Sequence, residues 1–319
     1  MMSKEWKLLR ALIKDKASLI KATVSTKRTV STMNRAVIKA TTRTSTSPPP
    51  DYRIATVLNL GHETIPSARA CVESIMDRLH STHDPYVALK CLILLHHIIT
   101  TKGSSILKDQ LSFFPLNGGI NSLILTRFRH KSKSDTWELS LWVQWYASVL
   151  ERNLVTSRIL GFSFYLISSS NSNPIPSTEF DLLRELDSLV SLVEEICKAP
   201  QSLNYQKMDL VHEIMLLVSE DYRFAQLQIK MRLEGLEDSD TIDRLSRDES
   251  TELISCLKRL EDCWPKLIEM FANRKRNDAF WELTSQMKIK LELMNERRER
   301  GRLVLWKDDR ERLWRELTR

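Results

Sequence analysis

The residues of this sequence best suited to chemistry are the lysines and arginines in its first fifty positions. Eleven basic residues stand there against two acids, Glu5 and Asp15, so the block carries a net charge of +9. The 319-residue chain as a whole carries +7, so the remaining 269 residues sum to −2. The basic residues are Lys4, Lys7, Arg10, Lys14, Lys16, Lys21, Lys27, Arg28, Arg35, Lys39 and Arg43. Clustered Lys and Arg side chains bind phosphates through charge-assisted hydrogen bonds. The block therefore predicts an anionic partner, either a lipid surface or a nucleic acid.

No other group of side chains has the spacing of a catalytic or metal site. The sequence lacks the GxGxxG, GxxxxGK[ST], GxSxG and HExxH motifs. His96 and His97 are adjacent, so on a helix they would point about 100° apart, which favours core or groove positions over metal ligation. His80 and His83 have no cysteine or carboxylate cluster beside them beyond Asp84. The sequence therefore predicts neither an enzyme nor a metal or cofactor site.

The elements that position the basic block are expected to be helices throughout. The chain has only 7 glycines, which disfavours turn-rich β folds and Gly loops around phosphates. Its longest apolar run, Cys91–Leu95, is far shorter than the roughly 20 residues that a membrane-spanning helix needs, and no signal peptide is evident. The five cysteines are scattered and odd in number, as is typical of reduced thiols in a cytosolic protein.

Apolar spacing predicts ten helices joined by short connections. In the first of them, Trp6, Leu9 and Ile13 fall on one face, flanked by Lys4, Lys7 and Arg10. This face is predicted either to insert into a membrane interface or to pack on the core. The fifth is apolar nearly all round, which predicts a buried central helix. The predicted spans are 4–21, 30–42, 53–60, 67–80, 84–101, 136–165, 178–198, 205–233, 248–272 and 278–300.

Three stretches of the sequence together resemble the ANTH domain of the clathrin-assembly adaptors, especially those of plants. Residues 37–42 (VIKATT) are similar to the start of that family's phosphoinositide motif. Residues 86–97 (YVALKCLILLHH) resemble its buried helix, and residues 125–152 resemble its run of Asn-Phe-Arg, Trp-x-x-Ser and Val-x-x-Tyr-x-x-x-Leu-x-Glu-Arg elements. These motifs occur in the family's order and spacing across residues 30–152.

The resemblance implies an all-α, right-handed helical solenoid with a longer C-terminal helical half. An ANTH-like domain is expected over residues 1–275, with a polar Pro-containing loop at 42–52 and a linker at 168–176. A charged helical extension is expected over 276–319. The implied function is a membrane-associated adaptor that binds phosphatidylinositol 4,5-bisphosphate and serves clathrin-mediated endocytosis. The implied locations are clathrin-coated pits and vesicles, the plasma membrane and the Golgi, and vesicle SNAREs are a further implied partner.

The sequence departs from the family at the phosphoinositide motif. The family has a Lys, a basic residue ten positions on, another two further, and then His or Tyr. Lys39 and Tyr52 match the first and last positions, but Pro49 and Asp51 stand at the two basic ones. Shifting the alignment by one residue places Pro50, Tyr52 and Arg53 there instead. The predicted phosphoinositide-binding residues are therefore Lys39, Arg43, Tyr52 and Arg53. The predicted membrane-contact residues are Lys4, Trp6, Lys7, Arg10 and Lys14.

Two further expectations concern partners. The chain ends at Arg319 without an Asn-Pro-Phe or Asp-Pro-Phe motif, so the tail through which relatives bind clathrin directly is not expected here. The alternative function is a basic helical protein that binds nucleic acid through residues 1–50. No recognition-helix motif or aromatic stacking platform supports that alternative.

Overall fold

A computed structural model describes residues 4–23, 28–100, 105–113, 123, 125, 128, 137–161, 179–201, 207–237, 241–271 and 278–317. Within these ranges it contains helices and no strand, which confirms the predicted all-α class. The predicted linker 168–176 lies outside the described residues. Lys4, Lys7 and most of residues 301–317 are described by their backbone alone.

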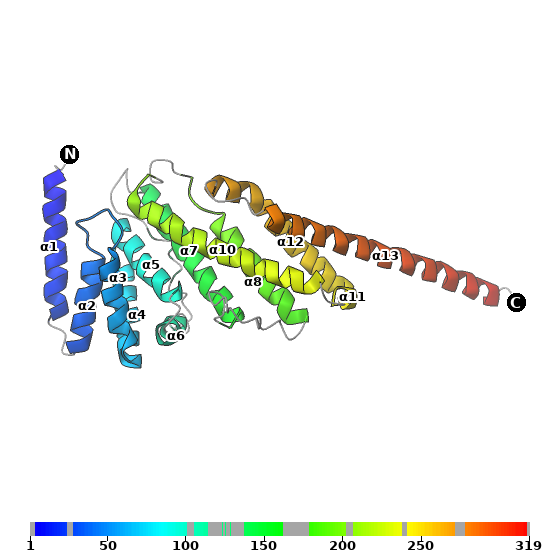
Figure 1. The fold of residues 1–319 in the computed structure, drawn as a ribbon, viewed down its shortest axis with the longest axis horizontal. Helices are drawn as coiled ribbons and strands as arrows, with labels where there is room; N and C mark the ends of the chain where they lie inside the picture. Colours follow the sequence, from blue (N-terminus) through cyan, green and yellow to red (C-terminus); the bar gives the residue numbers. More distant parts are fainter. Residues whose placement is uncertain are drawn as a thin grey trace. The chain divides into compact units, whose positions relative to one another are not determined.

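The helices follow one another along the chain as labelled in Figure 1. They are α1 (Lys4–Thr23), α2 (Arg28–Ala40), α3 (Asp51–His62), α4 (Ile65–Ser81), α5 (Pro85–Thr100), α6 (Ser105–Phe113), α7 (Trp137–Ile159), α8 (Glu179–Ile196), α10 (Asp209–Glu237), α11 (Thr241–Arg244), α12 (Arg247–Met270) and α13 (Asp278–Leu317). Each predicted helix is present, with ends shifted by a few residues. The largest shift is in α13, which runs well beyond the predicted end at residue 300. α6 and α11 were not predicted, because nine and four residues are too few to show a clear helical period.

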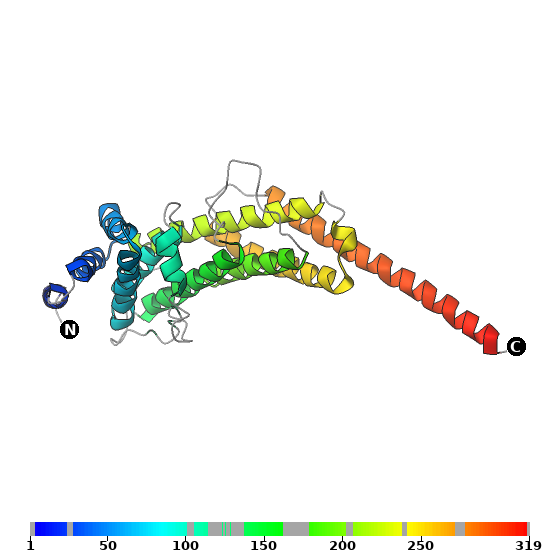
Figure 2. The same cartoon turned by 90° about the horizontal axis from the view of Figure 1, so that it is seen from below.

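The chain divides into two compact units, residues 1–166 with 198–222, and residues 167–197 with 223–319. In the first unit, successive helices pack on one another as in a solenoid: α1 on α2, α2 on α3 and α4, α4 on α5, and α5 on α7. The adjacent packing of α3, α4 and α5 can be followed in Figures 1 and 2. The expected boundary at residue 275 stays a prediction.

Helix α5 is the centre of the first unit. Val87, Leu92, Leu94 and Ile98 have no solvent-exposed surface, which confirms the burial predicted from the apolar sequence of this helix. Because α3, α4, α6 and α7 all contact α5, none of its residues is exposed, and only Tyr86, His97 and Thr100 are half-buried. The cysteines are likewise in the interior, since all five are buried and unpaired.

A buried polar triad joins three helices of this unit. The Nδ1 atom of His96 on α5 lies 2.9 Å from the hydroxyl of Tyr146 on α7. Its Nε2 atom lies 3.2 Å from a carboxylate oxygen of Asp221 on α10, and the side chains of His96 and Asp221 are fully buried. Burial raises the pKa of Tyr146 well above its usual value, and the charges of Asp221 and Glu213 add to this rise. The triad is part of the core, as expected for His96.

The second unit is built around the packing of α8 on α12. Arg259 of α12 reaches across to α8, where its guanidinium donates to Asp187 at 2.5 Å, Glu194 at 2.6 Å and the Ser191 hydroxyl at 3.0 Å. Hydrogen bonding to Glu194 is the main reason that the pKa of Arg259 lies above its usual value. Further along the chain α13 packs on α12, with Lys288 paired to Glu261.

Candidate functional site

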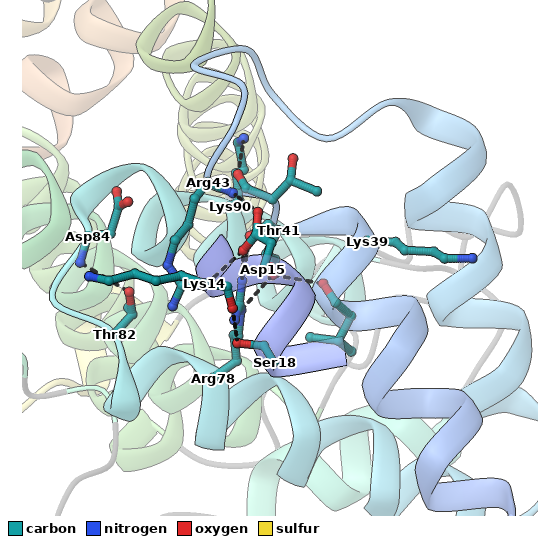
Figure 3. A network of polar contacts seen from close by, with 12 residues as sticks. Lys14, Asp15, Ser18, Lys39, Thr41, Arg43, Arg78, Thr82, Asp84 and Lys90 are labelled. Atoms are coloured by element: carbon teal, nitrogen blue, oxygen red, sulfur yellow. Dashed lines mark hydrogen bonds and ion pairs between the residues drawn. The ribbon is translucent and has the colours of Figure 1, made fainter. Parts of the chain in front are cut away.

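The structure gathers part of the basic block around one acidic residue, Asp15. One oxygen of this carboxylate accepts the backbone N–H of Arg43 at 2.8 Å. The other oxygen lies 2.8 Å from the Arg43 guanidinium and 3.4 Å from that of Arg78 (Figure 3). Asp15 comes from α1, Arg43 from the segment after α2, and Arg78 from α4. This cluster ties α1 to the rest of the first unit.

Arg78 is also held by Thr41, which follows α2. Its Nε atom donates to the Thr41 hydroxyl at 3.1 Å, and its Nη2 atom donates to the Thr41 carbonyl at 3.0 Å. Thr41 in turn donates its hydroxyl to the carbonyl of Val37. Burial lowers the pKa of Arg78, and the neighbouring charge of Arg43 lowers it further. The buried guanidinium is thus held by Thr41 while it shares the Asp15 carboxylate with Arg43.

Lys90 of α5 holds the non-helical segment 41–50 in place. The Lys90 side chain is buried, and its ammonium donates to the carbonyls of Thr42 at 2.9 Å and Ser45 at 2.6 Å. Burial lowers the pKa of Lys90 to about 8. Since its two acceptors flank Arg43 in sequence, Lys90 fixes the backbone on both sides of that residue. α3 begins at Asp51, so the predicted loop 42–52 is shorter by its last two residues.

Lys39, Tyr52 and Arg53 form a second basic surface. Arg53 donates to the backbone carbonyl of Lys39 at 2.5 Å and to the Tyr52 hydroxyl at 3.0 Å, with its guanidinium over the Tyr52 ring. The Lys39 side chain is exposed and extends away from the Asp15 cluster (Figure 3). Tyr52 is 65% exposed. These three residues therefore lie close together on the surface and present two cationic side chains beside an aromatic ring.

Arg43 takes no part in the contacts that join Lys39, Tyr52 and Arg53. Its guanidinium is mostly covered and paired with Asp15. Sequence reasoning placed Arg43 with Lys39, Tyr52 and Arg53, and it missed Asp15, Arg78 and Lys90 as the residues that fix the segment. Asp15 is one of only two acids in the basic block, and this isolation among cations is the feature of the sequence that could have pointed to it. Arg78 gave no signal, because its contact with residue 41 depends on the packing of α4 against α2.

Helix α1 turns an apolar face to the solvent. Trp6 is 61% exposed, and Leu9, Ile13 and Ile20 are also exposed. These four residues are spaced by three, four and seven positions. Such spacing places them on one side of a helix, where they form a stripe that Lys16 and Ala17 interrupt for one turn. Asp15 lies on the opposite side and is 7% exposed. Of the two predicted placements for Trp6 and Leu9, the structure therefore shows the exposed one.

The basic side chains on α1 flank this stripe. Arg10 and Lys14 are exposed and are predicted membrane contacts, whereas the side chains of Lys4 and Lys7 lie outside the described set. Among the described residues there is no group of His, Cys, Asp or Glu arranged to hold a metal ion. None of the described helices is long and apolar enough to cross a bilayer.

Comparison with known proteins places this arrangement in a family. Residues 32–231 match the ANTH domain. The Arabidopsis thaliana protein named "Putative clathrin assembly protein At4g40080" is 42% identical over 86% of this chain and 78% of its own length. Two other Arabidopsis thaliana proteins named in the same way, At5g65370 and At5g10410, are 30% and 31% identical. These two alignments each cover 88% of this chain, and 97% and 85% of the relatives. Because the match spans more than half of the chain and covers both the basic segment after α2 and the buried helix α5, this protein belongs to the ANTH domain family.

Proposed function

We propose that this protein is a peripheral membrane adaptor of clathrin coats. Membership of the ANTH domain family and the names of its relatives support an adaptor role over an enzyme. The observation that carries the membrane assignment is the exposed stripe on α1, which joins Trp6, Leu9 and Ile13 to Arg10 and Lys14. Such a helix suits the boundary between lipid headgroups and acyl chains.

The proposed ligand is an anionic leaflet that contains phosphoinositides, and phosphatidylinositol 4,5-bisphosphate is the family's expected lipid. Each Lys or Arg near such a surface contributes about 1 kcal/mol, so Arg10, Lys14, Lys39 and Arg53 together suffice for reversible recruitment. The proposed place of action is the clathrin-coated pit or vesicle, in endocytosis at the plasma membrane. Action at the Golgi and binding of vesicle SNAREs stay expectations from the family.

Co-sedimentation with anionic vesicles, compared at matched salt with a shift assay on nucleic acid, tests this function. Binding to vesicles without a nucleic-acid shift is the expected result. A nucleic-acid shift at physiological salt without vesicle binding would favour the alternative function and refute the membrane proposal.

Lipid selectivity is expected to be weak, because Pro49 and Asp51 stand where the family has basic residues. Binding should follow total negative charge on the vesicle and fall with salt, since the Debye length shrinks from roughly 8 Å at about 0.15 M to roughly 4 Å at about 0.5 M. Lys39→Glu should lower affinity by a few fold, and reversing Lys4, Lys7 and Lys14 together should lower it further. Vesicle co-sedimentation over a salt series measures both effects.

A suitable control is Lys290→Glu, which makes the same charge change at an exposed position on α13. This variant should bind nearly as the parent does. If binding to phosphatidylinositol 4,5-bisphosphate survives about 0.5 M salt and is abolished by Lys39→Glu alone, the headgroup site is specific and the expectation of weak selectivity is wrong.

Insertion of α1 can be followed through Trp6. The chain has 8 tryptophans, so the Trp6 signal is the difference between the spectra of the parent and of Trp6→Phe. We expect this difference emission to shift to the blue on anionic vesicles and to be quenched by brominated acyl chains, because the indole moves out of water. Trp137→Phe removes another exposed indole, on α7, and its difference spectrum should stay unchanged. An unshifted Trp6 signal on vesicles that do bind the protein would exclude insertion.

A further inference from the structure

We infer that Arg43 and Arg78 form an anion site that α1 closes with its own Asp15, and that a phosphomonoester opens it by displacing this carboxylate and releasing α1. The inference rests on the proposed membrane function and adds a ligand-controlled step to it. The ligand chemistry is a phosphate ester, carried either by a lipid headgroup or by a soluble inositol phosphate.

All donors of the site belong to the body of the first unit, and α1 supplies only the anion. The carboxylate of Asp15 receives the Arg43 backbone N–H and two guanidinium groups, which is a donor set that also suits a phosphate. Thr41 orients Arg78 through two hydrogen bonds that do not involve α1. Lys90 holds the backbone on either side of Arg43. These donors would thus keep their arrangement when Asp15 leaves.

The charges favour a ligand of higher valence than a carboxylate. Arg43 and Arg78 share the single negative charge of Asp15, and the cation of Lys90 lies close by with Asp84 as a further acid in its surroundings. The pair of guanidinium groups is therefore under-compensated. A phosphomonoester carries about −1.5 to −2 charges and three acceptor oxygens. It would balance both arginines, whereas the carboxylate balances one.

The docking of α1 combines this contact with packing on α2. Among the described side chains of α1, Asp15 alone is buried, and Ala11, Ser18 and Leu19 are half-buried. Trp6, Leu9, Ile13 and Ile20 face the solvent instead of the body. Helix α1 also packs on α2, and the Asp15 carboxylate is its ion-paired link to Arg78 of α4 and to Arg43. Exchange of that carboxylate for another anion would remove this link. Release would leave the Trp6 stripe free to enter a bilayer at an angle independent of the body.

The site is distinct from the surface grouping of Lys39, Tyr52 and Arg53. Lys39 points away from Asp15 and Arg43 in Figure 3, and Arg53 is turned toward the Lys39 carbonyl and Tyr52. Substitutions can therefore separate the two sites.

The test combines hydrogen–deuterium exchange of peptides within residues 4–23 with the affinity for soluble inositol 1,4,5-trisphosphate. In the parent, we expect this compound to raise α1 exchange, compared with sodium chloride at equal ionic strength. Asp15→Asn should raise exchange without the compound and tighten its binding by about tenfold, the factor for a pocket open one tenth of the time. Arg43→Gln should also raise exchange but weaken binding. If the cluster only holds α1 in place and binds no ligand, both variants should raise exchange and neither should change the affinity for inositol trisphosphate.

Matched controls make the same charge changes at exposed positions outside the proposed sites, on α1 for Glu5 and on α13 for Arg297. Glu5→Gln and Arg297→Gln should each change the affinity by less than about twofold, because exposed charges are screened. Circular dichroism of all variants verifies the fold. If Asp15→Asn binds inositol trisphosphate no tighter than Glu5→Gln does, or if saturating compound leaves α1 exchange unchanged in the parent, the inference is overturned.

A second arm identifies the source of the phosphate and separates this inference from the proposed function. Vesicles with phosphatidylinositol 4,5-bisphosphate are compared with phosphatidylserine vesicles of equal net charge. Release by the soluble compound and by the phosphoinositide vesicles, but not by phosphatidylserine, supports phosphate recognition from either source. Vesicle binding with α1 still protected on both would overturn the inference and leave the membrane function standing. Release by the soluble compound without any vesicle binding would refute the membrane function alone.

Discussion

Replacing Leu94 by alanine is expected to lower the free energy of unfolding by about 2–5 kcal/mol. Leu94 lies in the middle of α5 with no exposed surface, and four other helices surround α5. The substitution removes buried methyl and methylene groups and leaves a cavity that these neighbours can fill only in part. Urea denaturation followed by circular dichroism measures the loss.

Two controls separate this cavity effect from a general loss of helix stability. Leu94→Met keeps the volume and should cost less than about 1.5 kcal/mol. Leu293→Ala deletes the same atoms from an exposed position on α13 and should change stability by no more than about 0.5 kcal/mol. A cost for Leu94→Ala as small as that for Leu293→Ala would contradict the central position of α5.

Asp221→Ala should cost about 3–5 kcal/mol, because it removes one member of a fully buried polar triad. The imidazole Nε2 of His96 would lose the carboxylate oxygen that lies 3.2 Å from it, at a site where neither side chain has exposed surface. The triad bridges α5, α7 and α10, so the loss should also loosen the packing between these helices. Denaturation measures the stability, and near-ultraviolet circular dichroism of the neighbouring Trp142 and Trp145 reports the packing.

Tyr146→Phe and Glu234→Ala are the comparison variants for this prediction. The first removes only the hydroxyl 2.9 Å from His96 and should cost about 1 kcal/mol. The second deletes an exposed acid on the same helix as Asp221, paired with Lys230, and should cost less than about 0.5 kcal/mol. If Asp221→Ala were as mild as Glu234→Ala, the buried triad would not be a stabilising element of the core.

The candidate site shows where sequence reasoning stops. Clustering of charge pointed to residues 1–50, and the stripe of Trp6, Leu9 and Ile13 could be recognised from its spacing alone. Whether that stripe faced the core or the solvent could not be decided, because a helical period defines a face but not its neighbour. The exposure of Trp6 follows from the docking of α1 through its opposite side, at Asp15.

The arginines illustrate the same limit. The sequence suggested that Arg43 was one more cation for a lipid headgroup. In the fold, Arg43 forms an ion pair with an acid 28 positions earlier, and an arginine of α4 binds the same carboxylate. Lys90 lies within a run of apolar residues, so the sequence could assign it to a buried helix. The sequence could not show that its ammonium donates to the carbonyls of Thr42 and Ser45. Long-range polar contacts leave no periodic trace in the sequence.

The sequence by itself determined that this protein is all-α, that α5 is its buried centre and that its basic charge is concentrated at the N-terminus. These features depend on composition and on local spacing, which the chain carries whatever its tertiary fold. Only the tertiary structure decided which cations stay available to a ligand and which are neutralised internally, and which face of α1 meets water. Both depend on how α1, α2 and α4 approach one another, because a charge or an apolar face acquires its role from the group packed against it.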